Sequence, residues 1–323
     1  MTFLKPHKSI DEQIVILKNR GMVIDDENLA KTMLDKVGYY NLINGFKSPF
    51  IDDNSTVGEK YIEETKFEYL VNLYDFDTVL KARILTKILT IEKMLKSIIS
   101  YEFSSAHGEL NYLNEKCFNT YNPKSAQKTQ ELILKITETI RTATHPKYST
   151  NKQYDCIRHY KHNYGDIPIW IVFNILNFND IRNFYACLLP RTKQKIAEHI
   201  GNLFGRPVKP NELFNFICIL VEVRNACAHC QRLYTYTTKY DIRQNKEAQR
   251  ILNFVQLPIN NLISIIIIFK HFMSSEEFCD FYSELILSIK TLVNSIPNKY
   301  WSNIAEIMNL NINNLIQLLK IDI

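Results

Sequence analysis

Glycine and proline are scarce in this sequence, with 8 glycines and 10 prolines among 323 residues. Sandwiches and barrels need many tight turns, and these two residues form most of them. Their scarcity argues against a β-rich fold. The hydrophobic content of 46% provides a large core for a chain of this length. We therefore predict an all-α protein.

Long apolar runs are also missing. The most apolar stretch, from Leu262 to Phe269, is far shorter than the roughly 20 residues that cross a bilayer. The residues after Met1 lead into a charged segment and not into the apolar core of a signal peptide. The sequence therefore predicts a cytoplasmic protein that makes no contact with a membrane.

The cysteines form no regular framework, since there are 7 of them, scattered along the chain. An odd number at irregular spacing suits a reducing cytosol. Cys227, His229 and Cys230 suggest half of a zinc site, but structural zinc needs four ligands, usually in two spaced pairs, and no second pair is visible. We expect no metal and no cofactor.

A strong net charge is absent as well. The formal charge is +5 and the isoelectric point is near 8.6. This balance tolerates a polyanion, but the sequence lacks the basic tail of a nonspecific nucleic-acid binder. Charge thus permits a nucleic acid as a partner without indicating one.

What the sequence does contain is one long apolar helix, predicted from Asn211 to Tyr234. Asn211 can cap the first free amides, and neither glycine nor proline follows within this range. Three polar residues, Arg224, Asn225 and His229, interrupt its apolar sequence. We expect the rest of the chain to hold these three side chains in place.

The spacing of these residues leaves two interpretations open. Asn225 and His229 lie one turn apart, on a polar stripe with Glu222 and Arg232. Arg224 falls where a core residue is expected, about 140° from His229 on an ideal helix. The two converge only through the reach of arginine or with a second copy of the chain. Alternatively, His229 is a satisfied core histidine and Arg224 forms a buried ion pair with Glu222 or another acid.

A second long helix is predicted from Phe67 to Ile98, because apolar residues recur there at helical spacing. Asp77 falls on the apolar stripe of this helix. We predict that Asp77 pairs with Arg83, the alternative being that it orients Arg224.

Two aromatic segments offer weaker indications of RNA binding. For Gly38–Phe46, a packed turn with buried tyrosines is favoured over stacking on RNA. Residues 145–164 form a basic and aromatic segment that we predict to be irregular, and it contains Lys161 and His162. Such a loop can follow a phosphate backbone while its rings stack on unpaired bases. A solvated loop is the default interpretation.

The run RNACAHCQRLY, residues 224–234, carries a family resemblance. The spacing of Arg224 and His229 resembles the RxxxxH motif of HEPN-superfamily ribonucleases. The whole run is similar to the corresponding stretch of Abi-like abortive-infection proteins of the AbiD/AbiF type. Residues 38–46, residues 73–83 and the Pro-Ile-Trp element at 168–170 resemble the same family.

The resemblance implies an all-α, HEPN-type helical bundle. We expect an N-terminal helical element at residues 1–60, a helical core at 61–240 and a C-terminal helical extension at 241–323 that packs on the core. The resemblance also implies a homodimer, in which two motifs face each other across the two-fold axis and form one site. The implied partners are an RNA substrate and a structured noncoding RNA that restrains a toxic nuclease until phage infection.

The implied reaction is metal-independent cleavage of RNA by attack of the 2′-hydroxyl, which leaves a 2′,3′-cyclic phosphate and a 5′-hydroxyl. His229 would take or give the proton, and Arg224 would bind the nonbridging phosphate oxygens. Asn225 would fix the imidazole or contact the phosphate. Further candidates for contact with RNA are Arg232, Tyr234, Lys161 and His162.

Two other functions fit the same residues. One is a noncatalytic HEPN protein that binds RNA and acts with a structured small RNA or a partner. The other is a helical scaffold with no role in RNA metabolism. Expression toxicity that disappears with His229→Ala would separate the nuclease from both.

Overall fold

The computed structural model describes residues 6–56, 58–240, 242 and 261–308. Within these ranges the regular structure is helical, and residues on separate segments meet only in isolated bridges and not in strands. The prediction of an all-α protein is confirmed. None of the helices in the described ranges combines the length and apolar character that a membrane span requires.

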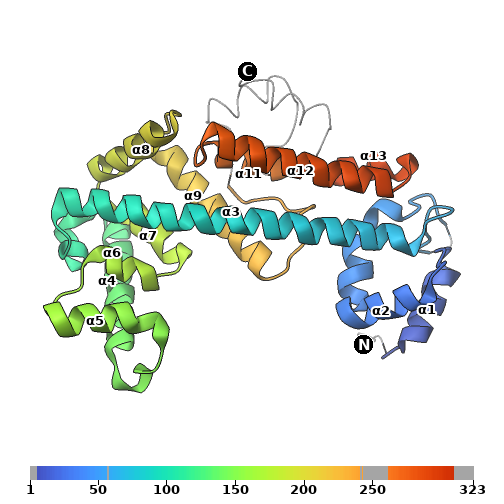
Figure 1. Ribbon diagram of the computed structural model, residues 1–323, viewed down its shortest axis with the longest axis horizontal. Coiled ribbons are helices and arrows are strands. Elements are labelled where there is room, and N and C mark those ends of the chain that lie inside the picture. The colour runs from blue at the N-terminus through green and yellow to red at the C-terminus, as the bar shows by residue number, and fades with distance from the viewer. Residues whose placement is uncertain (1–5, 57, 241, 243–260, 309–323) are drawn as a thin grey trace.

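One helix, α3 (Phe67–His107), runs through most of the length of the molecule (Figure 1). With 41 residues it is about 60 Å long at 1.5 Å per residue. A stripe of buried side chains along it confirms the helix predicted from Phe67 to Ile98. The helix continues to His107 and ends at Gly108, whose φ of 86° is a left-handed conformation that favours glycine.

The first helices pack together at one end of α3 (Figure 1). They are α1 (Ile10–Asn19) and α2 (Glu27–Val37). Gly38 ends α2 with a φ of 84°. A short π-helix follows, η1 (Tyr40–Asn44), and contacts both α2 and α3. A 3-10 turn, Ser48–Phe50, completes this part.

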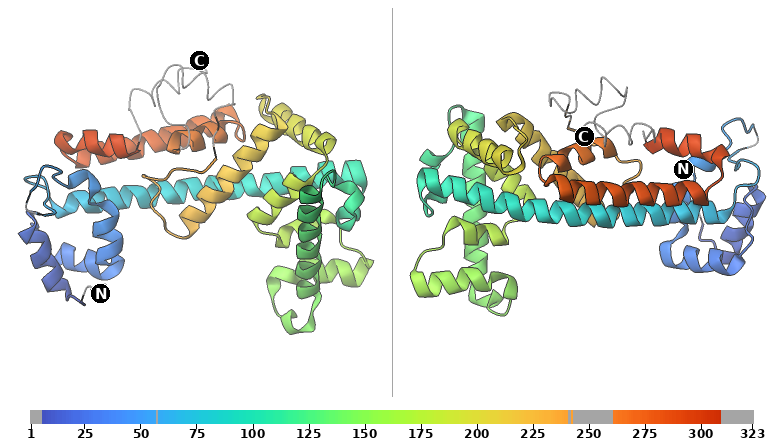
Figure 2. Two further views of the ribbon diagram at one scale, coloured as in Figure 1. Left: turned by 180° about the vertical axis from the view of Figure 1, so that it is seen from behind. Right: turned by 45° about the horizontal axis from the view of Figure 1, so that its top comes forward.

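A group of helices surrounds the other end of α3 (Figures 1 and 2). It consists of α4 (Pro123–Thr144), α5 (Asp155–Tyr164), α6 (Ile169–Ile175), α7 (Phe178–Cys187) and α8 (Pro190–Phe204). Short 3-10 turns lie at Asn111–Leu113, Glu115–Cys117, Pro146–Tyr148 and Lys152–Tyr154.

The prediction of an irregular segment at residues 145–164 is wrong over its second half, which forms α5. Arg158 explains much of the local order. Its guanidinium donates to the carbonyl oxygens of Ala143, Tyr148 and Asn151 at 3.4, 3.0 and 2.8 Å. One side chain thereby ties α5 to the end of α4 and to the turns between them.

The apolar helix α9 (Pro210–Ala228) crosses α3 near its middle and packs against it and against α7, α8 and α11 (Figure 1). The last described helices are α11 (Leu262–Lys270), α12 (Ser275–Ser295) and α13 (Asn298–Met308). Helix α12 lies along α3 (Figure 2), and Arg83 of α3 pairs with Glu284 of α12. The boundaries at residues 60 and 240 stay a prediction.

Candidate functional site

Helix α9 changes character near its C-terminal end. From Phe216 to Val221 each side chain is at most 3% exposed, and Val223 is fully buried. At the end of the helix, Arg224 is only partly buried, and Asn225 and His229 are exposed. The three polar residues singled out in the sequence therefore lie where this buried helix reaches the surface.

The helix ends at Ala228, so the prediction that it continues to Tyr234 is wrong. His229 is the first residue after it and donates its backbone N–H to the carbonyl oxygen of Asn225 at 2.9 Å. Cys230 then adopts a φ of 54°, which turns the chain away from the helix axis. His229 is held at this turn, one residue beyond the helix.

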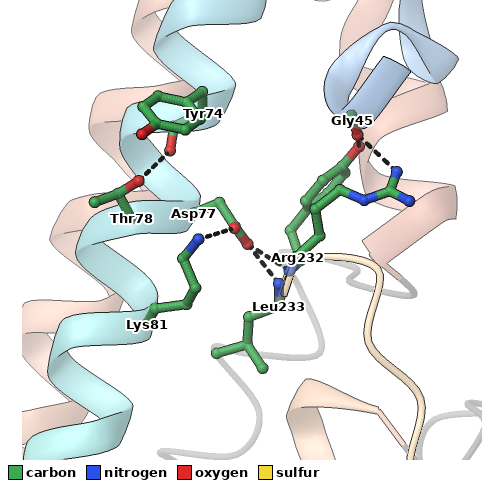
Figure 3. Close-up of polar contacts among 8 residues, drawn as sticks. Gly45, Tyr74, Asp77, Thr78, Lys81, Arg232 and Leu233 are labelled. Atoms are coloured by element: carbon green, nitrogen blue, oxygen red, sulfur yellow. Dashed lines mark hydrogen bonds and ion pairs between the residues drawn. The ribbon is translucent and has the colours of Figure 1, made fainter. Parts of the chain in front are cut away.

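A buried carboxylate accounts for the path of the chain after this turn. Asp77 is fully buried on α3, and its Oδ1 accepts the backbone N–H groups of Leu233 and Tyr234 at 2.8 and 2.7 Å (Figure 3). Its Oδ2 forms an ion pair with Nζ of Lys81 at 3.1 Å. A helix through Leu233 would direct these N–H groups to its own carbonyls, so the contact with Asp77 replaces the last predicted turns.

The pKa of Asp77 is raised by burial, and the Lys81 ammonium and the two backbone donors offset only part of that shift. Both roles considered for Asp77 in the sequence are wrong. Arg83 pairs with Glu284 instead, and Asp77 orients the chain beyond His229 and not the side chain of Arg224.

The guanidinium of Arg224 is incompletely satisfied. Its Nη1 donates to Oδ1 of Asn225 at 3.4 Å, whereas its Nε is buried and has no hydrogen-bond partner in the described part of the chain. Glu222 is engaged elsewhere, because it accepts the backbone N–H of Lys239 at 3.1 Å. The predicted alternative of an ion pair with Glu222 is therefore wrong. A buried donor without an acceptor is costly, and an anionic ligand would remove that cost.

Arg232 and Tyr234 both contact the N-terminal part of the protein through one atom. The carbonyl oxygen of Gly45 accepts Nη1 of Arg232 at 2.7 Å and the hydroxyl of Tyr234 at 3.2 Å (Figure 3). Arg232 is exposed, but Tyr234 is 2% exposed and stacks on Phe46 with ring centroids 5.3 Å apart. Burial raises the pKa of Tyr234 to about 12. The ring of Tyr234 is part of the core, so it offers no face to RNA in this structure.

Around His229 there is a cavity of about 1010 Å³, here called the His229 cavity. Its walls come from three parts of the chain. The principal lining residues are Lys36, Tyr40, Asn41 and Asn44 from the N-terminal part, Tyr74, Thr78 and Lys81 from α3, and His229, Arg232 and Tyr236 from the segment after α9. Three of them carry a permanent positive charge, and no aspartate or glutamate is among the described residues that line the cavity.

The N-terminal wall of this cavity was not predicted from the sequence. The segment 38–46 was expected to bury its tyrosines, and this is wrong for Tyr40, which is 77% exposed. The available signal was the break in helical periodicity at Gly38. It marks a π-helix, which turns successive side chains differently from an α-helix and is often found at functional sites.

The structure does not bring all predicted site residues together. Arg224 and Asn225 do not line the His229 cavity within one chain. Lys161 and His162 lie on α5, which stays at the far end of α3 from η1 in every view (Figures 1 and 2). Nζ of Lys161 donates to the carbonyl oxygen of Gly165 at 2.7 Å.

The cysteines next to His229 point to different environments. Cys227 is buried, and burial raises its pKa to about 12, whereas Cys230 is exposed. Across the described ranges, no three histidine, cysteine or acidic side chains gather in a way that would hold a metal ion.

Comparison with known protein families gives a match over most of the chain. The family model described as Abi-like protein matches residues 32–235. This span begins within α2 and ends after α9, so it includes η1, α3 and nearly all of the His229 cavity. No curated protein and no solved structure matches the chain.

Proposed function

The chain belongs to the Abi-like family of abortive-infection proteins, and from this premise we propose that it is a metal-independent endoribonuclease of the HEPN type that acts in antiphage defence. The observation that carries the proposal is the position of three polar residues where a buried helix reaches the surface: Arg224 is partly buried, and Asn225 and His229 are exposed. A structural histidine and a structural arginine would be enclosed and fully hydrogen-bonded. Here His229 is exposed, and Arg224 retains a buried donor without a partner among the described residues.

The chemistry follows from the residue types. An imidazole can accept or donate a proton, so His229 can act as a general base on the 2′-hydroxyl or as a general acid toward the leaving 5′-oxygen of RNA. The guanidinium of Arg224 presents a planar set of donors to the phosphate oxygens as negative charge develops there. Asn225 contacts Arg224 through its side chain and His229 through its backbone, and it would keep the two groups in register.

A homodimer would complete this site. In one chain His229 lies in its cavity, whereas Arg224 and Asn225 lie outside it. If two α9 ends meet across a two-fold axis, each His229 can approach the Arg224 of the other copy. The proposed partners are a second copy of this chain and an RNA strand.

A second candidate function is noncatalytic RNA binding, with a structured small RNA as the ligand. The observation that favours it is the charge of the His229 cavity, whose described lining residues include three cations and no carboxylate and would attract a phosphate backbone whether or not it is cut.

The test is cleavage of single-stranded RNA by the purified protein in the presence of a chelator, with chemical analysis of the new ends. His229→Ala and Arg224→Ala should each lower the cleavage rate at least about 100-fold, in line with the contribution of general acid-base and electrostatic catalysis. DNA of the same sequence should stay intact because it lacks the 2′-hydroxyl.

The matched controls are His159→Ala on α5 and Arg191→Ala on α8, both exposed residues outside the His229 cavity. They should cut RNA at the wild-type rate. Wild-type cleavage by His229→Ala would reject the catalytic assignment, and RNA that copurifies with the protein but is never cut would favour the second candidate.

A further inference from the structure

The His229 cavity has the size, charge and ring content of a nucleotide-binding site. Its volume of about 1010 Å³ is at the upper end of the roughly 300–1,000 Å³ of typical ligand pockets. It therefore has room for more than the scissile phosphate. The residues that line the cavity indicate what could occupy the rest of its volume.

The N-terminal wall supplies an uncommitted cation and an exposed ring. Lys36 is exposed and forms no ion pair or hydrogen bond with any residue that the structure describes. Tyr40 is 77% exposed at the start of η1. An exposed aromatic ring beside a cation suits an unpaired base followed by its phosphate, because the base stacks on the ring and the phosphate meets the ammonium.

The same wall and the wall formed by α3 also supply polar groups. Asn41 is exposed next to Tyr40, and its Nδ2 donates to the carbonyl oxygen of Val37 at 3.1 Å, so its side-chain oxygen remains available as an acceptor. Thr78 and Lys81 line the cavity from α3, and Lys81 lies on the other side of Asp77 from the Gly45 and Arg232 contact (Figure 3). The ammonium of Lys81 is oriented by its ion pair with Asp77.

We infer that the His229 cavity binds one or two unpaired nucleotides of an RNA strand next to the scissile bond, with a base stacked on Tyr40 and a phosphate on Lys36. The inference rests on the proposed function for the position of the scissile bond. It adds that the N-terminal part of the protein selects single-stranded RNA and sets sequence preference beside the cut. Duplex RNA is excluded because its bases are already stacked on each other.

Binding is tested separately from cleavage. The probe is a short fluorescein-labelled single-stranded RNA of mixed sequence, titrated against full-length His229→Ala protein by fluorescence anisotropy. Adding Tyr40→Ala should raise the Kd about 10-fold, the usual effect of losing one base-aromatic stack. Adding Tyr40→Phe should leave the Kd close to its starting value because the ring is kept.

A matched control is Tyr121→Ala, since Tyr121 is 95% exposed and lies outside the cavity. It should not change the Kd. Because Tyr40 is exposed, its loss should leave the thermal melting curve unchanged. Lys36→Gln should lower the slope of log Kd against log salt by about 0.7, the value for one phosphate contact on a single strand, whereas Lys116→Gln, an exposed lysine outside the cavity, should not.

Sequence preference gives the second readout. When a randomised single-stranded RNA is cut by the wild-type protein, the nucleotides beside the cut should be biased, and Tyr40→Ala should weaken that bias while Tyr121→Ala keeps it. Binding that depends on Tyr40 without any cleavage would support this inference and reject the proposed nuclease. If the protein cuts RNA but Tyr40→Ala changes neither the Kd nor the nucleotide bias beside the cut, the inference is overturned and the proposed nuclease activity stands. The inference would also be overturned if Tyr40→Ala weakened binding to the annealed duplex as much as it weakened binding to the single strand.

Discussion

Two parts of this molecule combine cations with tyrosines, and they differ in how far the protein itself engages the cations. Around α5, the guanidinium of Arg158 donates to three backbone carbonyls and the ammonium of Lys161 to a fourth. In the His229 cavity, Lys36 makes no such contact with the described residues, and Tyr40 is largely exposed. A similar composition therefore stabilises the local fold around α5, whereas in the His229 cavity it leaves a lysine and a tyrosine accessible to a ligand.

The comparison shows that a basic and aromatic sequence indicates a nucleic-acid site only when its donors are not used by the protein itself. A side chain that already satisfies backbone carbonyls has little left for a phosphate, and losing it costs stability. Substitutions at Asp77, Arg158 and Lys161 test this difference.

The largest effect is expected at Asp77, which fixes one wall of the cavity. Asp77→Ala leaves two backbone N–H groups and the ammonium of Lys81 without their buried acceptor. The free energy of unfolding should fall by about 3 kcal/mol, as when one member of a buried charged network is removed. Urea denaturation measures this change.

Asp77→Ala should also lower RNA cleavage per folded molecule, because the segment after His229 loses its anchor. Asp77→Asn keeps one acceptor oxygen and should retain part of both stability and cleavage. Full stability in Asp77→Ala would show that other contacts hold this wall.

A smaller effect, and on stability alone, is expected at Arg158. Arg158→Met keeps much of the apolar stem and removes the donors that tie α5 to α4. The free energy of unfolding should fall by about 2 kcal/mol, measured by the same urea titration. Cleavage and RNA affinity of the folded protein should not change, and a loss of either would break the contrast between the two regions.

The smallest effect is expected at Lys161, which was a candidate for RNA contact on sequence grounds. Its ammonium donates to the carbonyl oxygen of Gly165 at the end of α5. Lys161→Gln should leave the Kd for single-stranded RNA and its salt dependence unchanged, in contrast to Lys36→Gln. A lower slope of log Kd against log salt for Lys161→Gln would show that α5 contacts the RNA.

The sequence was informative where a pattern is local. The apolar stripe from Phe67 to Ile98 predicted most of α3, and the apolar run after Asn211 predicted α9. The polar residues of the candidate site interrupt such a run, so they stood out as well. The roles given to Arg224, Asn225 and His229 nevertheless remain proposals until cleavage is measured.

The sequence was uninformative where a distant residue decides. Helix α9 does not continue to Tyr234, because the N–H groups of Leu233 and Tyr234 bind Asp77 instead. Asp77 precedes these two residues by 156 and 157 positions in the chain. Local propensity gives no warning of such a contact, since nothing near Ala228 breaks a helix. The exposure of Tyr40 was missed for a related reason, because the orientation of a π-helix depends on its packing against α2 and α3.

The shared acceptor at Gly45 has a consequence for how the protein can be divided. Its carbonyl oxygen holds Arg232 and Tyr234 at the end of the family-matched region, and Tyr40 lies just before it in the same wall. A fragment that begins at residue 61 would keep His229 and Arg224 but lose the carbonyl oxygen of Gly45 that holds the segment after His229. Residues 36–46 supply one wall of the His229 cavity, and a chain without them would lack that wall.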